Sequence, residues 1–547
     1  MKAIHKIAPI YHILLILALS LTLIKCNQKD TLALTKWDSL KFENSAKYGV
    51  QSSEALNRCD RYMRAWLEYS DPQTGLIPRN LDNDRDIWNG KDAAADNYPF
   101  MILTSWFTSE ELFMHRMHEM LNTERNLTSR IGNLPDTWSF SKQDFHYPEI
   151  DSERIIFGAS EYVKDGLLPV TEWLGPSPWS ERMIELLDGI QDHIDVFQEL
   201  PNNKIGQAST EEVNGELLQA LSRVYWITGD DMYLNWAIKI GDNYLLSDNH
   251  PTRNLEYLRL RDHGCELISG LCELYYAVSH SNSKKKDEYQ APLHEMLDRI
   301  LEVGRNEHGM FYDAINPVTG EVISSHLSDT WGYTLNGYYT IFQIDGNKEY
   351  LEAIHKLFSN LAFYKNHDWE GNADGYADAI ESALNLYNRI PDPAVANWID
   401  SEIKVMWGMQ QESGIIEGWH GDGNFARTSL MYQLWKTKGT YLKPWRKDLH
   451  LGVEQLGDSL FIQISGDSDW EGRLYYDKPR HREYLKIPSD YPRINQFPEW
   501  FTVGTNELIK LIDIQNNRIE QLDVNQLING IPIDYNGGSV RLVAIKE

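Results

Sequence analysis

Three observations predict a ring of six helical hairpins, an (α/α)6 barrel, followed by a small β domain. Apolar residues recur at helical spacing from about residue 51 to about residue 437. Two kinds of connection alternate between the expected helices: a tight turn before a Tyr-Leu pair, and a Gly-apolar-apolar loop. From about Lys447 the pattern changes to short alternating runs that are typical of strands. The sequence therefore predicts a mainly α-helical fold, with the barrel over 46–446 and the β domain over 447–547.

The helical periodicity predicts twelve helices, which pair into six hairpins. Their approximate ranges are 51–69, 97–121, 179–198, 210–227, 230–247, 262–280, 287–304, 329–343, 347–362, 374–389, 393–410 and 423–437. The stretch Asn122–Pro178 has no helical periodicity, which predicts a lid or rim over a central cavity. An open superhelical stack of helix pairs is the alternative, but the irregular repeat lengths disfavour it.

The β domain is predicted from a strand pair over Leu449–Ile464 that turns at Gly457-Asp458. Further short runs with strand composition are Gly472–Tyr476, Glu483–Ile487, Phe501–Val503 and Ser539–Ile545. Two stretches, Pro479–Arg482 and Asp490–Val503, place charged residues among prolines and aromatics. We expect them to seal the interface between the two domains rather than to contact a substrate.

The composition limits the function. The 547 residues include 52 Lys and Arg against 80 Asp and Glu, which gives a net charge of −28. This balance argues against nucleic acid as a partner, so an anionic substrate would have to meet a local basic cluster. The 18 Trp and 29 Tyr supply many aromatic faces of the kind that stack against sugar rings.

Residues 1–26 have the pattern of an export signal, with Lys2 and Lys6 before the apolar run Ile13–Ile24. The run leads to Cys26, which we expect to be lipidated in an atypical lipobox with Lys25 before it; cleavage and release is the alternative. A polar linker over 27–45 follows, and the chain is expected in the periplasm or at the cell surface. The other cysteines, Cys59, Cys265 and Cys272, are expected to be buried free thiols. No zinc spacing occurs, and the sequence gives no reason to expect a metal or cofactor.

Polar and aromatic residues gather where inner helices are expected to begin. The most concentrated cluster is Arg261–Glu266 (RDHGCE), which opens the apolar run Leu267–Ser279. Because burying such groups is costly unless they are paired, they predict a polar pocket. Similar clusters supply the expected substrate-binding residues: Trp88, Lys91, Asp92, Asn214, Glu216, Asp329, Trp331, Trp419, Asp422 and Arg427. Helix capping is the alternative for Asn214, Asp329 and Asp422.

Two chemistries fit these clusters. A glycosidase needs two facing carboxylates, for which Glu266, Asp329, Asp374 and Asp422 are candidates, and Asp374 shares a helix face with Asp378. Elimination on a uronic acid needs a group that neutralises the carboxylate, a base and an acid. Arg261 or Asn214 is expected to neutralise the carboxylate. His263, or else His420, is expected to act as the base, and Tyr333 as the acid. The His, Arg and Tyr content of the clusters favours elimination.

Four stretches resemble a family of exported proteins from polysaccharide-degrading bacteria: Trp88–Phe100, Arg261–Glu266, Gly421–Arg446 and Asp490–Val503. The architecture is similar to that of polysaccharide lyases and unsaturated glucuronyl hydrolases, and the chain resembles the oligosaccharide dehydratase of ulvan breakdown. The resemblance implies loss of water from the terminal uronic acid of an oligosaccharide, leaving a 4,5-unsaturated end. A hydrolase acting on terminal or unsaturated uronic acids, and a surface glycan-binding lipoprotein without catalysis, are the alternatives.

Overall fold

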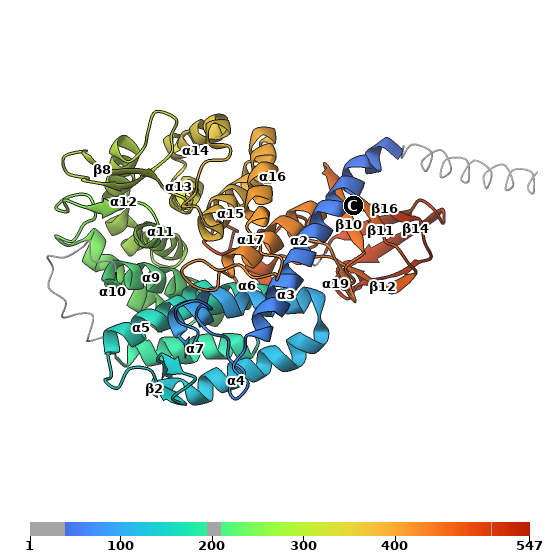
Figure 1. The fold of residues 1–547 in the computed structure, drawn as a ribbon. Helices are drawn as coiled ribbons and strands as arrows, with labels where there is room; N and C mark the ends of the chain where they lie inside the picture. The colour runs from blue at the N-terminus through green and yellow to red at the C-terminus, as the bar shows by residue number, and fades with distance from the viewer. Residues whose placement is uncertain (1–38, 194–208, 505) are drawn as a thin grey trace, which may run out of the picture.

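The computed structural model describes residues 39–193, 209–504 and 506–547. The predicted export signal, Cys26 and the first part of the linker lie outside the described residues. Figure 1 shows a ring of helices beside a smaller β region, so the predicted helical toroid with a C-terminal β domain is confirmed. Across the described residues, no helix is both long enough and apolar enough to cross a membrane. Cys59, Cys265 and Cys272 are buried free thiols, as expected.

The outer helices of the ring are amphipathic, with one face buried. In α14, for example, Tyr350, Ile354 and Leu357 follow helical spacing and face the core, while the other side is exposed. The outer helices are α2 (Glu43–Glu68), α4 (His118–Leu127) with the π-helical η3 (Leu112–Met117), α7 (Pro178–Gln191), α10 (Asp231–Leu245), α12 (Ser283–Val303), α14 (Lys348–Asn360) and α16 (Pro393–Gly408).

The inner segments are buried on most sides, and α17 is buried along its whole length. They are the π-helical η2 (Gly90–Asn97) with α3 (Tyr98–Thr108), α5 (Ser152–Glu161) with the π-helical η4 (Tyr162–Leu167) and α6 (Leu168–Leu174), α9 (Ser209–Thr228), α11 (His263–Ser281), α13 (Trp331–Asp345), α15 (Ala373–Arg389) and α17 (Asn424–Thr437). Each contacts the next, and α17 contacts α3, which closes the ring. Among the described residues the ring thus has seven inner segments, one more than the six hairpins expected.

The additional inner segment comes from the stretch Asn122–Pro178, for which the sequence predicted no helix. That prediction was wrong for residues 122–127, which belong to α4, and for α5, η4 and α6, which are mostly buried. The π-helical η4 and the proline at the start of α6 interrupt the period of an α-helix, so no continuous helical pattern runs through this segment. The remainder of the stretch carries four short strands: β2 (Ser129–Ile131), β3 (Leu134–Pro135), β4 (Trp138–Ser139) and β5 (Asp144–Phe145). The predicted helix 97–121 also ends early, since α3 stops at Thr108.

The β domain consists of two antiparallel sheets around a shared apolar core. One sheet has the order β10-β11-β16-β13-β14 and the other β15-β12-β9. Val453 and Ile462 of the first sheet and Leu474 and Ile533 of the second belong to the same buried cluster. The strands are β9 (Tyr441–Lys443), β10 (His450–Leu456), β11 (Ser459–Ser465), β12 (Trp470–Tyr475), β13 (Leu508–Asp513), β14 (Arg518–Asp523), β15 (Ile531–Tyr535) and β16 (Ser539–Lys546).

The predicted hairpin around Gly457-Asp458 is confirmed as β10 and β11, with Leu456 opposite Ser459. The predicted runs Glu483–Ile487 and Phe501–Val503 are not strands, because both belong to the connection between β12 and β13, which packs on the ring.

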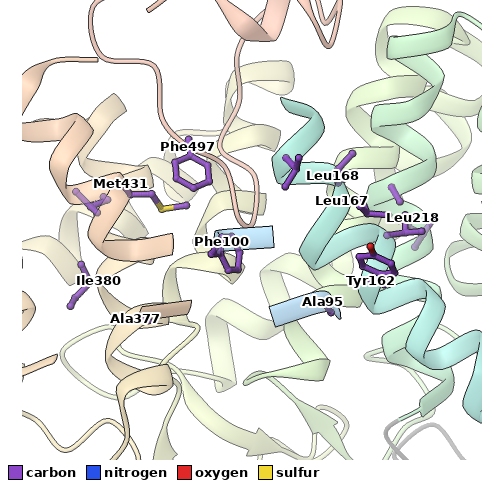
Figure 2. Close-up of a cluster of buried hydrophobic side chains, with 14 of the residues drawn as sticks. Ala95, Phe100, Tyr162, Leu167, Leu168, Leu218, Ala377, Ile380, Met431 and Phe497 are labelled. Carbon is purple, nitrogen blue, oxygen red and sulfur yellow. The ribbon is translucent and has the colours of Figure 1, made fainter. Parts of the chain in front are cut away.

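This connection, residues 476–507, reaches into one end of the ring. Figure 2 shows Phe497 beside Phe100 and Met431, which belong to inner helices α3 and α17. Asn385 of α15 donates a hydrogen bond to the Arg493 carbonyl at 3.3 Å. Phe100 and Phe497 are almost fully buried, so the segment closes this end of the central space.

Candidate active site

The first turns of the inner helices bring polar side chains together at one end of the ring. Two of the inner segments, η2 and η4, are π-helical where they carry these side chains, and π-helical turns are rare and frequent at functional sites. We call the assembly the central cluster: Asp92, Asp96, Lys164, Asp165, Glu266, Tyr333, Asp374, Asp378, Glu381, His420, Asp422 and Arg427.

One side of the central cluster pairs an imidazole with two carboxylates. His420 Nε2 lies 3.5 Å from Asp96 Oδ2 and 3.9 Å from Asp92 Oδ1, while Nδ1 lies 3.0 Å from the Gly421 carbonyl oxygen. Burial opposes the imidazolium, but Asp96 and Asp92 outweigh it and raise the pKa of His420 to about 9. His420 therefore carries a positive charge at neutral pH.

The two carboxylates beside His420 behave differently. Burial favours the neutral form of Asp92, but His420 and Arg79 hold its pKa below the usual value. The pKa of Asp96 is raised well above the usual value by burial and, despite His420, by the charges of Asp165, Asp92 and Asp374. The Asp96 side chain is nevertheless 18% exposed. It is thus a carboxyl group with a raised pKa that solvent can reach.

The opposite side of the central cluster is built on α15 and α17. Asn424 Nδ2 donates to Asp374 Oδ1 at 2.8 Å. Arg427 pairs with Asp378 at 2.7 Å and with Glu381 at 2.9 Å. The Tyr333 hydroxyl oxygen lies 2.9 Å from Asp378 Oδ1 and 2.8 Å from Glu381 Oε2, so this nearly buried side chain contacts two carboxyl groups rather than facing open space.

Asp374 lies between the two sides. Its charge acts on Asp96, His420 and Asp378 alike. Burial and the charge of Asp374 also raise the pKa of Asp422 to about 7. Asp96 and Asp374, both half-buried, therefore belong with His420 and Asp422 to one electrostatically coupled group, which we call the recess.

The π-helical η4 supplies a buried lysine. Lys164 Nζ lies 2.7 Å from Asp165 Oδ1 and 2.6 Å from Glu266 Oε1. Glu266 also accepts a hydrogen bond from Gln219, and burial raises its pKa to about 7. Because Glu266 is fixed by these partners, it supports the recess rather than reacting in it. Asp165, with its side chain 22% exposed, is the member of this group that reaches the recess.

Two groups of side chains could hold a metal ion. Asp92, Asp96 and His420, and separately Glu161, Glu212 and Glu216, bring ligand atoms within 4.8 Å of one another. In the second group Lys91 Nζ lies 3.6 Å from Glu161, and burial raises the pKa of Glu161 and Glu216. The Lys91 ammonium group and protons on the carboxyl groups thus already balance the negative charges of the second group. In the first group the His420 imidazolium balances the charges of Asp92 and Asp96.

The predicted cluster at Arg261 lies at the rim of the recess. Arg261 Nε is 3.2 Å from Asp329 Oδ1, and the guanidinium also pairs with Glu370. Burial raises the pKa of Asp329 to about 7 despite Arg261. Since two carboxylates already hold Arg261, the structure does not support its expected role as a free neutralising cation. The side chain of His263, the expected base, lies outside the described part of the structure.

Three further expectations need correction. Trp88 and Trp331 are buried, so neither can stack on a substrate; Trp88 lies in β1 (Ile87–Trp88), opposite Trp138 of β4. Asn214 donates to the Tyr244 hydroxyl on the outer helix α10 at 2.9 Å, which turns it away from the recess. Trp419, by contrast, is 81% exposed.

Sequence reasoning left five residues in or beside the central cluster out of the expected site: Asp96, Lys164, Asp165, Glu381 and Asn495. Asp96 stood within a recognised cluster, four residues after Asp92, and this spacing was an available signal. Lys164 and Asp165 lie in the segment without periodicity. Asn495 lies at the tip of the segment that was expected only to seal the domain interface. Its side chain donates to Asp165 at 2.6 Å and accepts from Arg427 at 2.8 Å.

No family model and no curated protein sequence matches this chain. Among solved structures, the chain is similar to the GH76A α-1,6-mannanase of Salegentibacter sp. HEL1_6, with 13% identity, coverage of 69% of this chain and 98% of that chain, and a TM-score of 0.39. It is also similar to the unsaturated glucuronyl hydrolase of Bacillus sp. GL1, with 12% identity, coverage of 52% and 88%, and a TM-score of 0.37. Identity this low, with TM-scores below 0.5, assigns neither a family nor an activity to this chain.

Proposed function

We propose that the protein is a carbohydrate-active enzyme that hydrolyses a glycosidic bond of an oligosaccharide by acid–base catalysis. The observation that carries this proposal is the coupled pair of Asp96 and Asp374 in one recess. Glycoside hydrolysis requires one carboxyl group that retains its proton and a second that is ionised. Asp96, with its raised pKa, fits the proton donor. Asp374, which Asn424 orients by a hydrogen bond, fits the base or nucleophile.

The surrounding residues fit positioning roles. Arg427 and Tyr333 hold Asp378 beside Asp374, and Lys164 holds Asp165 near Asp96. Side chains that ion pairs and hydrogen bonds fix in this way keep the reacting groups in place and reduce reorganisation during the reaction. His420, Lys164 and Arg427, the cations of the described central cluster, are each engaged by carboxylates.

Elimination on a uronate remains the second candidate, as dehydration of a terminal uronic acid or as a related lyase reaction on an ulvan-type oligosaccharide. The observation that favours it is the charge of His420, whose pKa near 9 leaves an imidazolium at the recess. An imidazolium could hold a substrate carboxylate and stabilise charge that develops beside it. The carboxylates that share His420 weigh against this candidate.

Product analysis distinguishes the two candidates. The purified protein is incubated with neutral and with uronate-containing oligosaccharides, and product masses and ultraviolet absorbance are followed. Hydrolysis adds one water per bond broken and gives no new absorbance. Loss of one water without chain shortening, with the absorbance of a conjugated enol ether, indicates dehydration; the same absorbance with chain cleavage indicates a lyase. Saturable binding without any product would instead support a glycan-binding protein.

The first testable prediction concerns the two proposed catalytic carboxylates. Asp96→Asn and Asp374→Asn should each lower kcat/KM by about 10²- to 10⁴-fold, the usual contribution of a positioned acid or base. Asp231→Asn is the matched control, since Asp231 is an exposed aspartate at the first turn of the outer helix α10. Wild-type activity in Asp96→Asn, in a protein with an unchanged melting temperature, would exclude Asp96 as the proton donor.

We further propose that the protein is exported and carries a lipid on Cys26, as the pattern of residues 1–26 indicates. Fractionation of producing cells, with detection of the protein in soluble and membrane fractions, tests this proposal.

A further inference from the structure

A polar cleft that is separate from the recess lies beside it, at the start of η2. Its volume is about 330 Å³, which is at the small end of the usual range for ligand pockets. Residues 135–137 and 146–147, the first turns of α5, residues between 79 and 92 and the exposed Trp419 form its walls. Half of the wall residues belong to the stretch Asn122–Pro178, and these have no part in the reaction proposed above.

The walls of this cleft carry three aromatic rings, each with a cation over one face. The Arg154 guanidinium lies 4.2 Å from the centre of the Tyr147 ring, and Lys91 Nζ lies 4.2 Å from that of Phe157. Arg79 lies 5.9 Å from the Trp419 ring. Tyr147 is 40% exposed and Trp419 is 81% exposed. Cations stacked on the rings hold them before a ligand arrives, and the exposed faces offer stacking surface.

The charges of the cleft are balanced within the protein. Arg79 Nε lies 2.5 Å from Asp92, Arg154 lies 3.1 Å from Asp136, and Lys91 lies 3.6 Å from Glu161. A ligand with a net charge therefore finds no excess of opposite charge here. Carboxylate oxygens and N–H groups that alternate around aromatic faces suit a ligand with many hydroxyl groups, each of which both donates and accepts.

The cleft and the recess meet at Asp92. Its Oδ2 atom accepts from Arg79 on the cleft side, while Oδ1 lies 3.9 Å from His420, the neighbour of Asp96. One side chain thus separates the cleft from the proposed proton donor. Ligand atoms of Asp92, Asp96 and His420 lie within 4.8 Å of one another, so adjacent residues of one oligosaccharide can contact the two places.

We propose that this cleft is a second sugar subsite, which takes an uncharged sugar residue adjacent to the residue processed at Asp96. The proposal rests on the proposed function, because it assigns to that site an oligosaccharide that spans two positions. Trp419 and Tyr147 provide the stacking faces, and the paired carboxylates and guanidinium groups bind the hydroxyls.

Binding measured on a protein that does not turn over tests the subsite. Asp96→Asn protein is titrated by calorimetry with gluco-, manno-, xylo- and uronate-containing oligosaccharides, from the monosaccharide to the hexasaccharide. The affinity should rise with chain length for the series that binds. Adding Trp419→Ala or Tyr147→Ala should weaken binding of the longer chains by about tenfold, the effect of one aromatic contact, and flatten the dependence on chain length.

The matched control is Tyr225→Ala, which removes an aromatic side chain near the last turn of α9, at the far end of the ring. It should leave the dependence on chain length intact. Equal affinities for all chain lengths, identical titrations with and without Trp419, or salt-dependent binding of uronate-containing chains alone would each overturn the subsite. A failure of the proposed function is detected by a different experiment, because it would appear as wild-type turnover by Asp96→Asn protein in the product assay.

Discussion

His420 shows how burial and neighbouring charges act in opposite directions on one group. Burial alone would favour a neutral ring, yet the carboxylates of Asp96, Asp92 and Asp374 raise its pKa to about 9. Burial and the charges of Asp165, Asp92 and Asp374 raise the pKa of Asp96 well above its usual value, while His420 lowers it. At the scale of single residues, the chemistry of the recess therefore depends on how many carboxylates share each cation.

The raised pKa of His420 predicts a stability that depends on pH. An imidazole with a pKa of about 9 in the folded chain and about 6.5 in the unfolded chain stabilises the fold fully below pH 6.5. This contribution, up to about 3 kcal/mol, is lost as the pH rises from about 6.5 to 9. His420→Gln should thus be less stable than the wild type at pH 6, and the difference should shrink by pH 9.5.

Urea unfolding at these two pH values measures the effect, and His355→Gln, which removes an exposed imidazole from α14, is the control. A difference between wild type and His420→Gln that does not change with pH would contradict the assigned pKa.

At the scale of elements, close approach of inner helices sets the geometry of the recess. Gly215 of α9 and Gly270 of α11 face the neighbouring helix with no room for a side chain. A Cβ atom on Gly215 would lie 2.4 Å from the backbone of Glu266 and Leu267, and one on Gly270 would lie 2.7 Å from the Gly215 carbonyl oxygen. The contact fixes the distance of Glu266 from the side chains of α9.

Gly215→Ala should therefore destabilise the protein, since backbone atoms can make room only if the two helices separate. We expect a loss of about 1–3 kcal/mol, as for other overpacked cores, seen as a lower midpoint of thermal unfolding. Gly408→Ala, at the last position of α16 and with no atom within 4 Å of the new Cβ, should be neutral or slightly stabilising. Equal midpoints for the two variants would show that α9 and α11 tolerate a wider spacing.

At the scale of the whole molecule, the β domain contributes to the recess through the segment that closes one end of the ring. The Asn495 backbone N–H donates to Glu381 at 2.6 Å, and its side chain joins Asp165 of η4 to Arg427 of α17. Arg493, two residues earlier, is buried against Glu172 and Asp490. The two domains therefore build the recess together.

Asn495→Ala should lower kcat/KM by about tenfold and alter its dependence on pH, because Asp165 and Arg427 lose a shared partner near Asp96. The backbone bond to Glu381 remains, so we expect the fold to persist. Asn525→Ala, an exposed position in the β domain, is the control. The prediction is tested by pH–rate profiles together with thermal unfolding, and a loss of stability with an unchanged pH profile would assign Asn495 a structural role only.

The sequence by itself determined the outer helices other than α4, the turns between hairpins, the hairpin at Gly457 and the location of the polar clusters at helix starts. These features have local signals: an amphipathic period arises wherever one face of a helix meets solvent, and turns require particular residues. The polar clusters at His420, Arg427 and Glu266 were recognisable for the same local reason, since charged residues at the start of an apolar run stand out.

Only the tertiary structure decided which of these side chains share the recess. The segment α5, η4 and α6 gave no continuous periodic signal because the π-helical η4 interrupts it, and it adds Lys164 and Asp165. Asn495 and Asp165 are 330 residues apart in the chain, a separation that no local pattern bridges. The raised pKa values of Asp96 and His420 likewise depend on burial and on carboxylates from several helices, which come together only when the ring closes.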